Sequence, residues 1–298
     1  MREREKIERI KALLGAVEIG DDAAVVDHAG GPLVLTVDEQ VEGTHFERAL
    51  LSFEDVGYRA TMAAASDLAA MGARPLAALA AWILPKEFAD SDVEQIARGQ
   101  RQACDELGAQ VITSGARAPM VIRSGARAPM VVGGNLARGP VVSIATTWIG
   151  TCESPITRAG AKPGDGVWLC GAVGLAARGF RALSQKQSAP DEMIQAWRRP
   201  RALIAEGLRM ARVATACIDV SDGLASDAGH IASASRVRIR FERELDDDAL
   251  FGGEDYALLC TSPAPIEGFT RIGVVEAGEG VFVGDHPIED GGGFDHFV

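Results

Sequence analysis

Aspartates stand at the ends of several apolar segments of this sequence, and the stretch CIDVSDGLASD (217–227) alone contains three. Four separated segments each bring such a residue to a chain turn: Asp21 and Asp22, Asp38, Asp67, and Asp219 with Asp222. If the segments converge, two carboxylates about 4 Å apart repel by roughly 4 kcal/mol at an effective dielectric constant near 20, so protons or cations must neutralise them. Carboxylate oxygens favour Mg²⁺, Mn²⁺ or Ca²⁺, and a site rich in acids suits Mg²⁺ that also binds substrate phosphates.

Each of these residues also has a purely structural interpretation, because Asp favours turns and helix caps. Periodicity alone does not show that the four segments meet, and we expect Asp227 to be a solvated helix residue. His45 in EGTHF and Glu254 in GGEDY fit structural positions as well as contacts to a substrate. The pair Gly133–Gly134 in VVGGNLARG marks a turn or lets backbone N–H groups approach an anion.

Composition narrows the class of protein. The 298 residues are 47% hydrophobic with a net charge of −12, which argues against nucleic acid as a partner because its phosphates would be repelled. The five cysteines form no CxxC pair, which favours reduced thiols in a cytoplasmic protein. The charged N-terminus is unlike a signal peptide, and the longest apolar stretch (75–85) is too short to span a bilayer.

The first half of the chain alternates between predicted helices and strands. Ser52 and Asp55 fit a capping box before an alanine-rich helix that Gly72 and Pro75 end. Asp67 therefore falls near the C-terminal end of this helix, where an acid opposes the helix dipole. The remaining predictions for this half are helices over 4–14 and 91–107 and strands over 32–38, 75–84 and 139–150.

After Gly150 the pattern restarts, so we predict a domain boundary there and two α/β domains, 1–150 and 151–298. The second half predicts strands within 157–171, 216–220, 256–261 and 271–276, and helices near 174–184, 199–212 and 222–234. SGARAPMV occurs twice, at 114–121 and 124–131, which we interpret as a local duplication that forms an extended surface loop.

Eight motifs in order resemble one family. They are IGDDAAVV, TVDEQVEGTHF, ASDLAAMGARP, GGNLARGP, TRAGAKPGD, DVSDGLASD, GGEDYALL and GGFDHF. They run from residue 19 to 297 and resemble the thiamine-monophosphate kinases, of the superfamily that includes aminoimidazole ribonucleotide synthetase. The resemblance implies an α/β fold with mixed sheets, an N-terminal domain that dimerises through its sheet, and a C-terminal α/β domain. It also implies that ATP and several Mg²⁺ ions lie in the cleft between them.

The resemblance further implies a role for individual residues. Metal ligands would be Asp22 with Asp21, Thr36, Asp38, Asp67, Asn135, Asp219 and Asp222. ATP contacts would come from Gly133, Gly134, Asn135, Arg158 and Ser221, and thiamine phosphate contacts from His45, Glu254 and Phe294. Asn135 stands where the family often has Asp, so one ligand charge is lost. Residues 241–256 are shorter than the family's usual stretch, and the repeat at 114–131 is an insertion.

The implied reaction transfers a phosphoryl group from ATP to thiamine monophosphate to form thiamine diphosphate. The acceptor is itself an ionised phosphate, so no dedicated catalytic base is required, and the task is positioning and charge neutralisation. Two alternative functions stay open at this point. The protein is another ATP-dependent enzyme of the superfamily, such as aminoimidazole ribonucleotide synthetase, or it is a non-catalytic paralogue that binds nucleotide or metal. The sequence lacks the motifs GxxxxGK[ST], HExxH and GxSxG.

Overall fold

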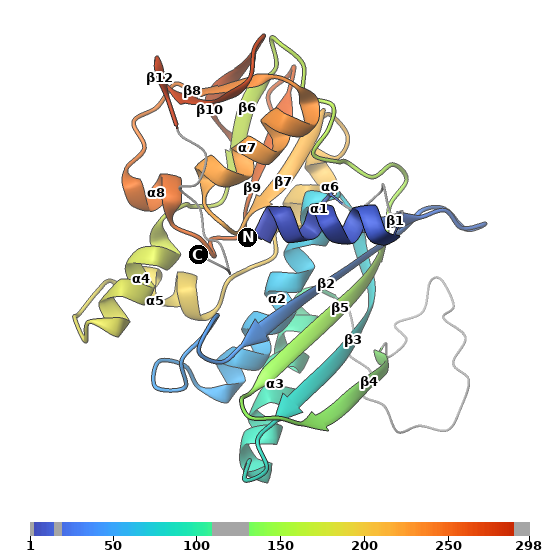
Figure 1. The fold of residues 1–298 in the computed structure, drawn as a ribbon, viewed down its shortest axis with the longest axis vertical. Coiled ribbons are helices and arrows are strands. Elements are labelled where there is room, and N and C mark those ends of the chain that lie inside the picture. The colour runs from blue at the N-terminus through green and yellow to red at the C-terminus, as the bar shows by residue number, and fades with distance from the viewer. Residues whose placement is uncertain (1–2, 15–19, 109–130, 289–298) are drawn as a thin grey trace.

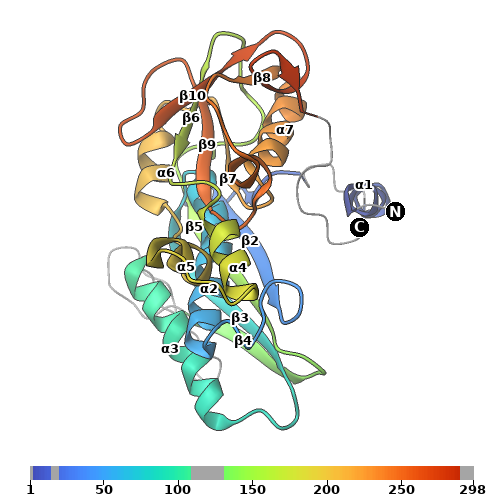
Figure 2. The same ribbon diagram turned by 90° about the vertical axis from the view of Figure 1, so that its left-hand side faces the viewer.

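The structure is a computed structural model that describes residues 3–14, 20–108 and 131–288. Within these residues the chain forms two β-sheets, one from each half of the sequence, with helices packed around them (Figure 1). Helix α1 (Glu3–Leu14) lies to one side of the sheets (Figure 2). No helix in this part of the chain combines the length and apolar character that a bilayer crossing requires.

The first sheet has five strands in the spatial order β1-β2-β5-β3-β4, and only the pair β3 and β4 is parallel. Along β2 the side chains of Val34 and Thr36 are buried whereas Val37 is exposed, so one face of the sheet is packed and the other open. In chain order the strands are β1 (Ala24–Val26), β2 (Leu33–Val41), β3 (Arg74–Leu84), β4 (Val131–Arg138) and β5 (Ser143–Thr151).

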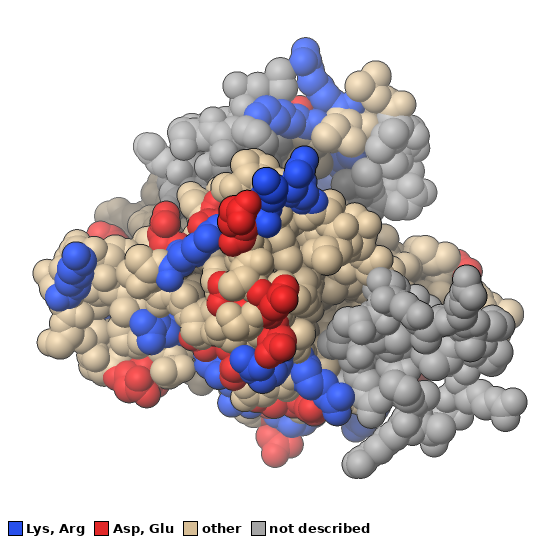
Figure 3. Space-filling model, turned by 90° about the horizontal axis from the view of Figure 1, so that it is seen from below, with Lys and Arg blue, Asp and Glu red and all other residues tan. Residues whose placement is uncertain are grey.

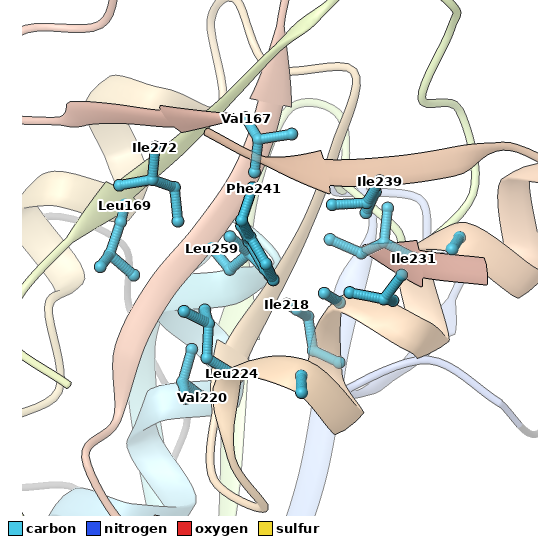
Figure 4. Close-up of a cluster of buried hydrophobic side chains, with 14 of the residues drawn as sticks. Val167, Leu169, Ile218, Val220, Leu224, Ile231, Ile239, Phe241, Leu259 and Ile272 are labelled. Atoms are coloured by element: carbon cyan, nitrogen blue, oxygen red, sulfur yellow. The ribbon is translucent and has the colours of Figure 1, made fainter. Parts of the chain in front are cut away.

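The second sheet has seven strands in the order β12-β11-β8-β10-β6-β9-β7, with only β8 and β11 parallel. Its core lies between the sheet and helix α7, where Ile218, Phe241 and Leu259 from the strands point toward Leu224 and Ile231 (Figure 4). The strands are β6 (Gly166–Cys170), β7 (Ala216–Val220), β8 (Arg238–Phe241), β9 (Ala257–Ser262), β10 (Thr270–Glu276), β11 (Gly280–Val283) and β12 (His286–Pro287).

Seven further helices in the described residues surround the sheets, and α2 and α3 lie on one side of the first sheet (Figure 2). They are α2 (Phe53–Ala70), α3 (Asp90–Glu106), α4 (Leu175–Ser184), α5 (Asp191–Arg198), α6 (Ile204–Met210), α7 (Leu224–Ser235) and α8 (Asp247–Phe251). Glycine lets α2 and α3 approach closely, because a Cβ at Gly57 would lie 2.1 Å from the Ile96 carbonyl oxygen. Helix α2 is therefore packed tightly between α3 and the sheet.

The predicted mixed α/β architecture is confirmed. Ser52 caps α2 as expected, since its side-chain oxygen accepts a hydrogen bond from the backbone N–H of Asp55. Several short elements were not predicted: β1, α5, α8, β8, β11 and β12. The interpretation of Gly133 and Gly134 as a turn is wrong, because both glycines lie within β4. The alternative, that their backbone N–H groups approach an anion, stays a prediction. The repeated segment up to residue 130 lies outside the described residues.

Candidate active site

Three carboxylates from distant parts of the chain form the centre of the site. One oxygen each from Asp22, Asp67 and Asp219 lies within 4.8 Å of the other two. Asp22 precedes β1, Asp67 lies in the last turn of α2, and Asp219 lies near the end of β7. The packing of α2 against both the first sheet and β7 therefore brings together acids that the sequence separates widely.

Burial makes this cluster unfavourable for negative charge. It raises the pKa of Asp22 to about 7, where the nearby guanidinium of Arg158 opposes the shift and the charge of Asp219 adds to it. Burial likewise raises the pKa of Asp219 to about 6, and burial together with Asp219 holds the pKa of Asp67 well above its usual range. Like charges in a site with little water favour either bound protons or a bound cation.

The donor set fits a divalent cation. The Asp22 side chain is only 1% exposed, and its Oδ2 atom is buried without a hydrogen-bond partner among the described residues. A buried carboxylate oxygen with no partner is costly unless a proton or a cation neutralises it. Hard oxygen ligands from three carboxylates match the preferences of Mg²⁺ and Ca²⁺.

Three predicted site residues are joined to this cluster by hydrogen bonds. The Arg158 backbone N–H donates to Asp21 Oδ1 at 2.6 Å, and its guanidinium donates to Asp22 Oδ1 from Nη2 at 2.6 Å and from Nε at 3.0 Å. The Thr36 hydroxyl donates to Asp67 Oδ2. Arg158, itself held by Asp21, and Thr36 thus orient two of the three central carboxylates.

A cavity of about 800 Å³ opens beside the cluster. Asp67 and Asp219 of the cluster line it, together with Asp38, Ser221 and Asp222. The same cavity is also lined by His45, Glu254 and the aromatic side chains of Phe180, Trp197 and Phe251, and the rings of Phe180 and Trp197 lie 5.1 Å apart. A ligand that carries both phosphates and an aromatic ring would match this mixed lining.

Asp38 and His45 reach the cavity from β2 and the turn that follows it. Asp38 lies on the packed face of β2, where burial raises the pKa of its carboxyl. His45 accepts a hydrogen bond at Nδ1 from the backbone N–H of Val41 at 3.1 Å. That bond fixes the imidazole orientation at the cavity wall.

Asp227 corrects one sequence expectation. We expected a solvated residue, but Asp227 is 2% exposed and its Oδ2 atom accepts the backbone N–H groups of Ser221 at 3.1 Å and Asp222 at 3.2 Å. The turn between β7 and α7 leaves these two donors without partners in the helix, so a carboxylate in the first turn satisfies them. Asp227 therefore shapes the turn that presents Ser221 and Asp222 to the cavity.

The strand with Gly133, Gly134 and Asn135 lies apart from the cluster within one chain. Asp38 pairs with Thr146, which pairs with Ala80, which pairs with Gly134. At the spacing of neighbouring strands, three steps across the sheet place Gly134 about 14 Å from Asp38. Asn135 is exposed on this edge strand. Phe294 lies outside the described residues.

Sequence reasoning missed two residues that hold Glu254 in the cavity wall. Its carboxylate accepts hydrogen bonds from the guanidinium of Arg59, on α2, and from the indole N–H of Trp197, on α5. Arg59 is fully buried. The available signal was a single arginine in the apolar, alanine-rich segment 56–70, where a charge needs a buried partner.

Comparison with known proteins places this site in a family. Residues 20–152 match the family model described as "AIR synthase related protein, N-terminal domain". The chain is 33% identical to the thiamine-monophosphate kinase of Aquifex aeolicus (strain VF5), with 98% of this chain and 96% of that protein covered. The chain belongs to the thiamine-monophosphate kinase family.

A second curated relative and a solved structure extend the similarity. The Salmonella typhimurium (strain LT2) enzyme is 31% identical, with 94% of this chain and 91% of that protein covered. A solved structure of AaThiL in complex with AMPPCP and TMP superposes with a TM-score of 0.87 at 34% identity, covering 99% of this chain and 97% of that one. The resemblance of the eight sequence motifs to this family is thereby confirmed.

Proposed function

We propose that this chain transfers the terminal phosphoryl group of ATP directly to thiamine monophosphate, which yields thiamine diphosphate and ADP. The observation that carries the proposal is the cluster of three carboxylates, two of which, Asp67 and Asp219, line a cavity that also has aromatic walls. Both substrates are anionic, so a site that gathers cations solves the main physical difficulty of bringing them together. The relative AaThiL has been solved with AMPPCP and TMP.

The proposed metal site is built from Asp22, Asp67 and Asp219, with Asp38 and Asp222 at its border in the cavity. When bound, several Mg²⁺ ions would neutralise the phosphates and align the attacking and leaving oxygens. The protein's own part is to hold its carboxylates in place. Arg158 does so through Asp21 and Asp22, and the Thr36 hydroxyl does so through Asp67.

The proposed substrate contacts come from residues that line the cavity or adjoin the cluster. Ser221 and Arg158, which bonds to Asp22, are assigned to ATP, and His45 and Glu254 are assigned to the acceptor, whose ring would meet the aromatic side chains. No side chain is assigned as a base, because the acceptor phosphate is ionised at neutral pH. We leave Gly133, Gly134 and Asn135 out of the site of a single chain, since β4 lies on the far edge of the sheet.

The proposed assembly is a homodimer formed through the open face of the first sheet, within an N-terminal domain of residues 1–150 that precedes a C-terminal domain of residues 151–298. Val26, Val37 and Ile83 are 49%, 64% and 37% exposed on strands of this sheet. Val37 points away from α2, because its neighbour Thr36 bonds to Asp67 of that helix. Apolar side chains on an open sheet face are typical of a protein interface.

The proposed environment is the cytoplasm, with small molecules and a second copy of the chain as the partners. All five cysteines are free thiols, which agrees with a reducing compartment. On the face shown in Figure 3, acidic and basic side chains lie interspersed among the described residues. Such a surface, on a chain with a net charge of −12, is unsuited to nucleic acid.

A coupled assay tests the proposed function. Purified protein is mixed with ATP and thiamine monophosphate, with Mg²⁺ or with a chelator, and both ADP and thiamine diphosphate are measured. We expect equal amounts of the two products, only with Mg²⁺ present. Binding of ATP and metal without formation of thiamine diphosphate would contradict the kinase proposal and favour a non-catalytic binding protein.

A further inference from the structure

Arg59 is a charged residue in the middle of the protein's interior. It lies on α2 among buried alanine and methionine residues and is 0% exposed. A guanidinium removed from water in this way is tolerated only when its N–H groups are fully paired. The hydrogen-bond partners of Arg59 therefore indicate its role in the structure.

The guanidinium joins three segments that are distant in sequence. Nε donates to the side-chain oxygen of Gln40 on β2 at 3.0 Å, Nη1 donates to the backbone carbonyl of Trp197 on α5, and Nη2 donates to Glu254 Oε1. The guanidinium carbon also lies 5.3 Å from the centre of a Trp197 ring. Arginine suits this place because its planar fork donates in several fixed directions at once.

Glu254 is fixed through both its side chain and its backbone. Its second oxygen, Oε2, accepts the indole N–H of Trp197 at 2.8 Å. Its backbone N–H donates to the Ser221 carbonyl at 2.7 Å, which ties Glu254 to the turn that presents the proposed ATP contact. The backbone of Glu254 has a φ of 66°, and that of Tyr256 a φ of 51°. Residues other than glycine occupy this left-handed region at an energetic cost, so the surrounding contacts must enforce it.

The position of Glu254 matters because it lies next to aromatic side chains of the cavity wall: its partner Trp197 has its ring 5.1 Å from that of Phe180. The Glu254 side chain is 30% exposed and lines the cavity with Phe180 and Trp197. Both oxygens of the Glu254 carboxylate accept hydrogen bonds, so it has a fixed orientation beside aromatic faces, although Arg59 offsets part of its charge. That combination recognises a planar ring that carries positive charge.

We propose that Arg59 is a positioning residue that holds the Glu254 carboxylate in the cavity wall for recognition of the acceptor's cationic ring. This inference rests on the proposed function, since that function supplies the acceptor. Arg59 itself touches no substrate and acts through Glu254. Its loss would impair acceptor binding more than ATP binding, because its guanidinium hydrogen bonds join Gln40, Trp197 and Glu254 rather than a proposed ATP contact or metal ligand.

The main test compares Arg59→Lys with the wild type and with Arg240→Lys, the same substitution in a more exposed arginine–carboxylate pair, as the control. Arg240 forms a similar arginine–carboxylate pair with Glu276, with distances of 2.9 and 2.7 Å, and is absent from the lining of the cavity. We expect Arg59→Lys to raise KM for thiamine monophosphate at least about tenfold. The single ammonium group of lysine cannot donate to all three hydrogen-bond partners of the planar guanidinium. KM for ATP should stay within about twofold of the wild type, and Arg240→Lys should change neither constant.

A purely structural role predicts a different pattern. If Arg59→Lys lowers kcat with both KM values unchanged, the variant merely contains fewer active molecules and the inference is overturned. Should Arg59→Lys fail to fold, Trp197→Phe tests the same point, because it removes the indole donor to Glu254 and leaves a smaller aromatic ring in the cavity wall. Trp197→Phe should also raise KM for the acceptor selectively, and an unchanged KM would count against the inference.

Two further measurements separate this inference from the proposed function. In the double variant Arg59→Lys with Glu254→Gln, acceptor binding measured by calorimetry without ATP should be no weaker than in Glu254→Gln alone. A wild type that neither binds nor phosphorylates thiamine monophosphate would refute the proposed function and, with it, this role of Arg59. If the wild type is active but a crystal structure of Arg59→Lys shows Glu254 unmoved, only the positioning role is refuted.

Discussion

Asp67 and Asp219 belong to different halves of the chain, yet oxygens of both lie within 4.8 Å of an oxygen of Asp22. At the scale of single residues, this proximity is unfavourable in the free protein, since burial raises the pKa of Asp219 to about 6 and that of Asp22 to about 7. The protein keeps a cluster that weakens its own fold. Such a cluster makes physical sense when a cation that arrives with the substrate neutralises it.

Substitution of Asp219 by Asn should separate activity from stability. We expect Asp219→Asn to lower kcat by more than about a hundredfold, because a metal ligand loses its charge. Without metal, the variant should unfold at a higher temperature than the wild type, because one of several repelling carboxylates is gone. Kinetic assays and thermal unfolding with a chelator measure the two effects, with the exposed Asp90→Asn on α3 as the control. Full activity in purified Asp219→Asn would refute the metal assignment.

At the scale of secondary-structure elements, α4 depends on a side chain from another part of the chain. Its N-cap residue Gly174 offers no side-chain cap. The carboxylate of Asp255 instead accepts the backbone N–H groups of Gly174 at 2.6 Å and Ala176 at 3.1 Å. The residue after Glu254 therefore fixes the helix that carries Phe180 into the cavity. The same loop thus positions a substrate contact and a cavity wall.

Asp255 gives this element a pH-dependent contribution to stability. Burial raises the pKa of its carboxyl from 3.8 to about 6, although the two N–H groups oppose the shift. An acid whose folded-state pKa is raised keeps its proton longer in the folded protein, so the contribution is fully present below pH 3.8 and is lost as pH rises toward 6. The side chain of the Asp255→Asn variant stays neutral at every pH, so this variant does not lose the contribution as pH rises.

Measurement of unfolding free energy against pH tests this contribution. We expect the wild type to lose stability relative to Asp255→Asn between about pH 4 and pH 6.5, by an amount on the order of 2 kcal/mol. Denaturant unfolding of both proteins across this range gives the difference directly. A constant difference, or one that grows in favour of the wild type as pH rises, would show that the carboxyl is ionised throughout.

At the scale of the whole molecule, the two sheets differ in how their faces are covered. The second sheet packs against α7 through a large apolar core (Figure 4). The first sheet is covered by α2 on one face and leaves Val37 64% exposed on the other. Apolar side chains that stay in water on an ordered sheet favour association of two copies.

Val37→Glu should disrupt the proposed homodimer. A buried, unpaired carboxylate at the centre of an apolar interface is costly, so we expect a shift toward monomer of at least about tenfold in the dissociation constant. Size-exclusion chromatography with light scattering at several concentrations measures the shift. Val213→Glu, an exposed apolar position in the second half of the chain, is the control and should leave the assembly unchanged. A monomeric wild type would refute this assembly.

Much of the secondary structure of this protein follows from interactions between residues close together in the sequence. Periodicity and the Ser52 cap predict α2 and the strands around it, and the order of the motifs indicates the family. The placement of Asp67 in the last turn of a helix follows from those signals alone. These features depend on neighbours a few positions away, so a single sequence contains the information they need.

Only the tertiary structure decided which residues meet. The packing of α2 against β7 brings Asp67 to Asp219, and the strand order leaves Asn135 at the far edge of the first sheet. The contact between the two halves of the chain also paired Arg59 with Glu254. Asp227, which looked solvated, is buried where its carboxylate bonds to the turn before α7. The contacts between the two halves join positions far apart in sequence, and no local pattern of residue types records which distant partner a charge will find in the folded core.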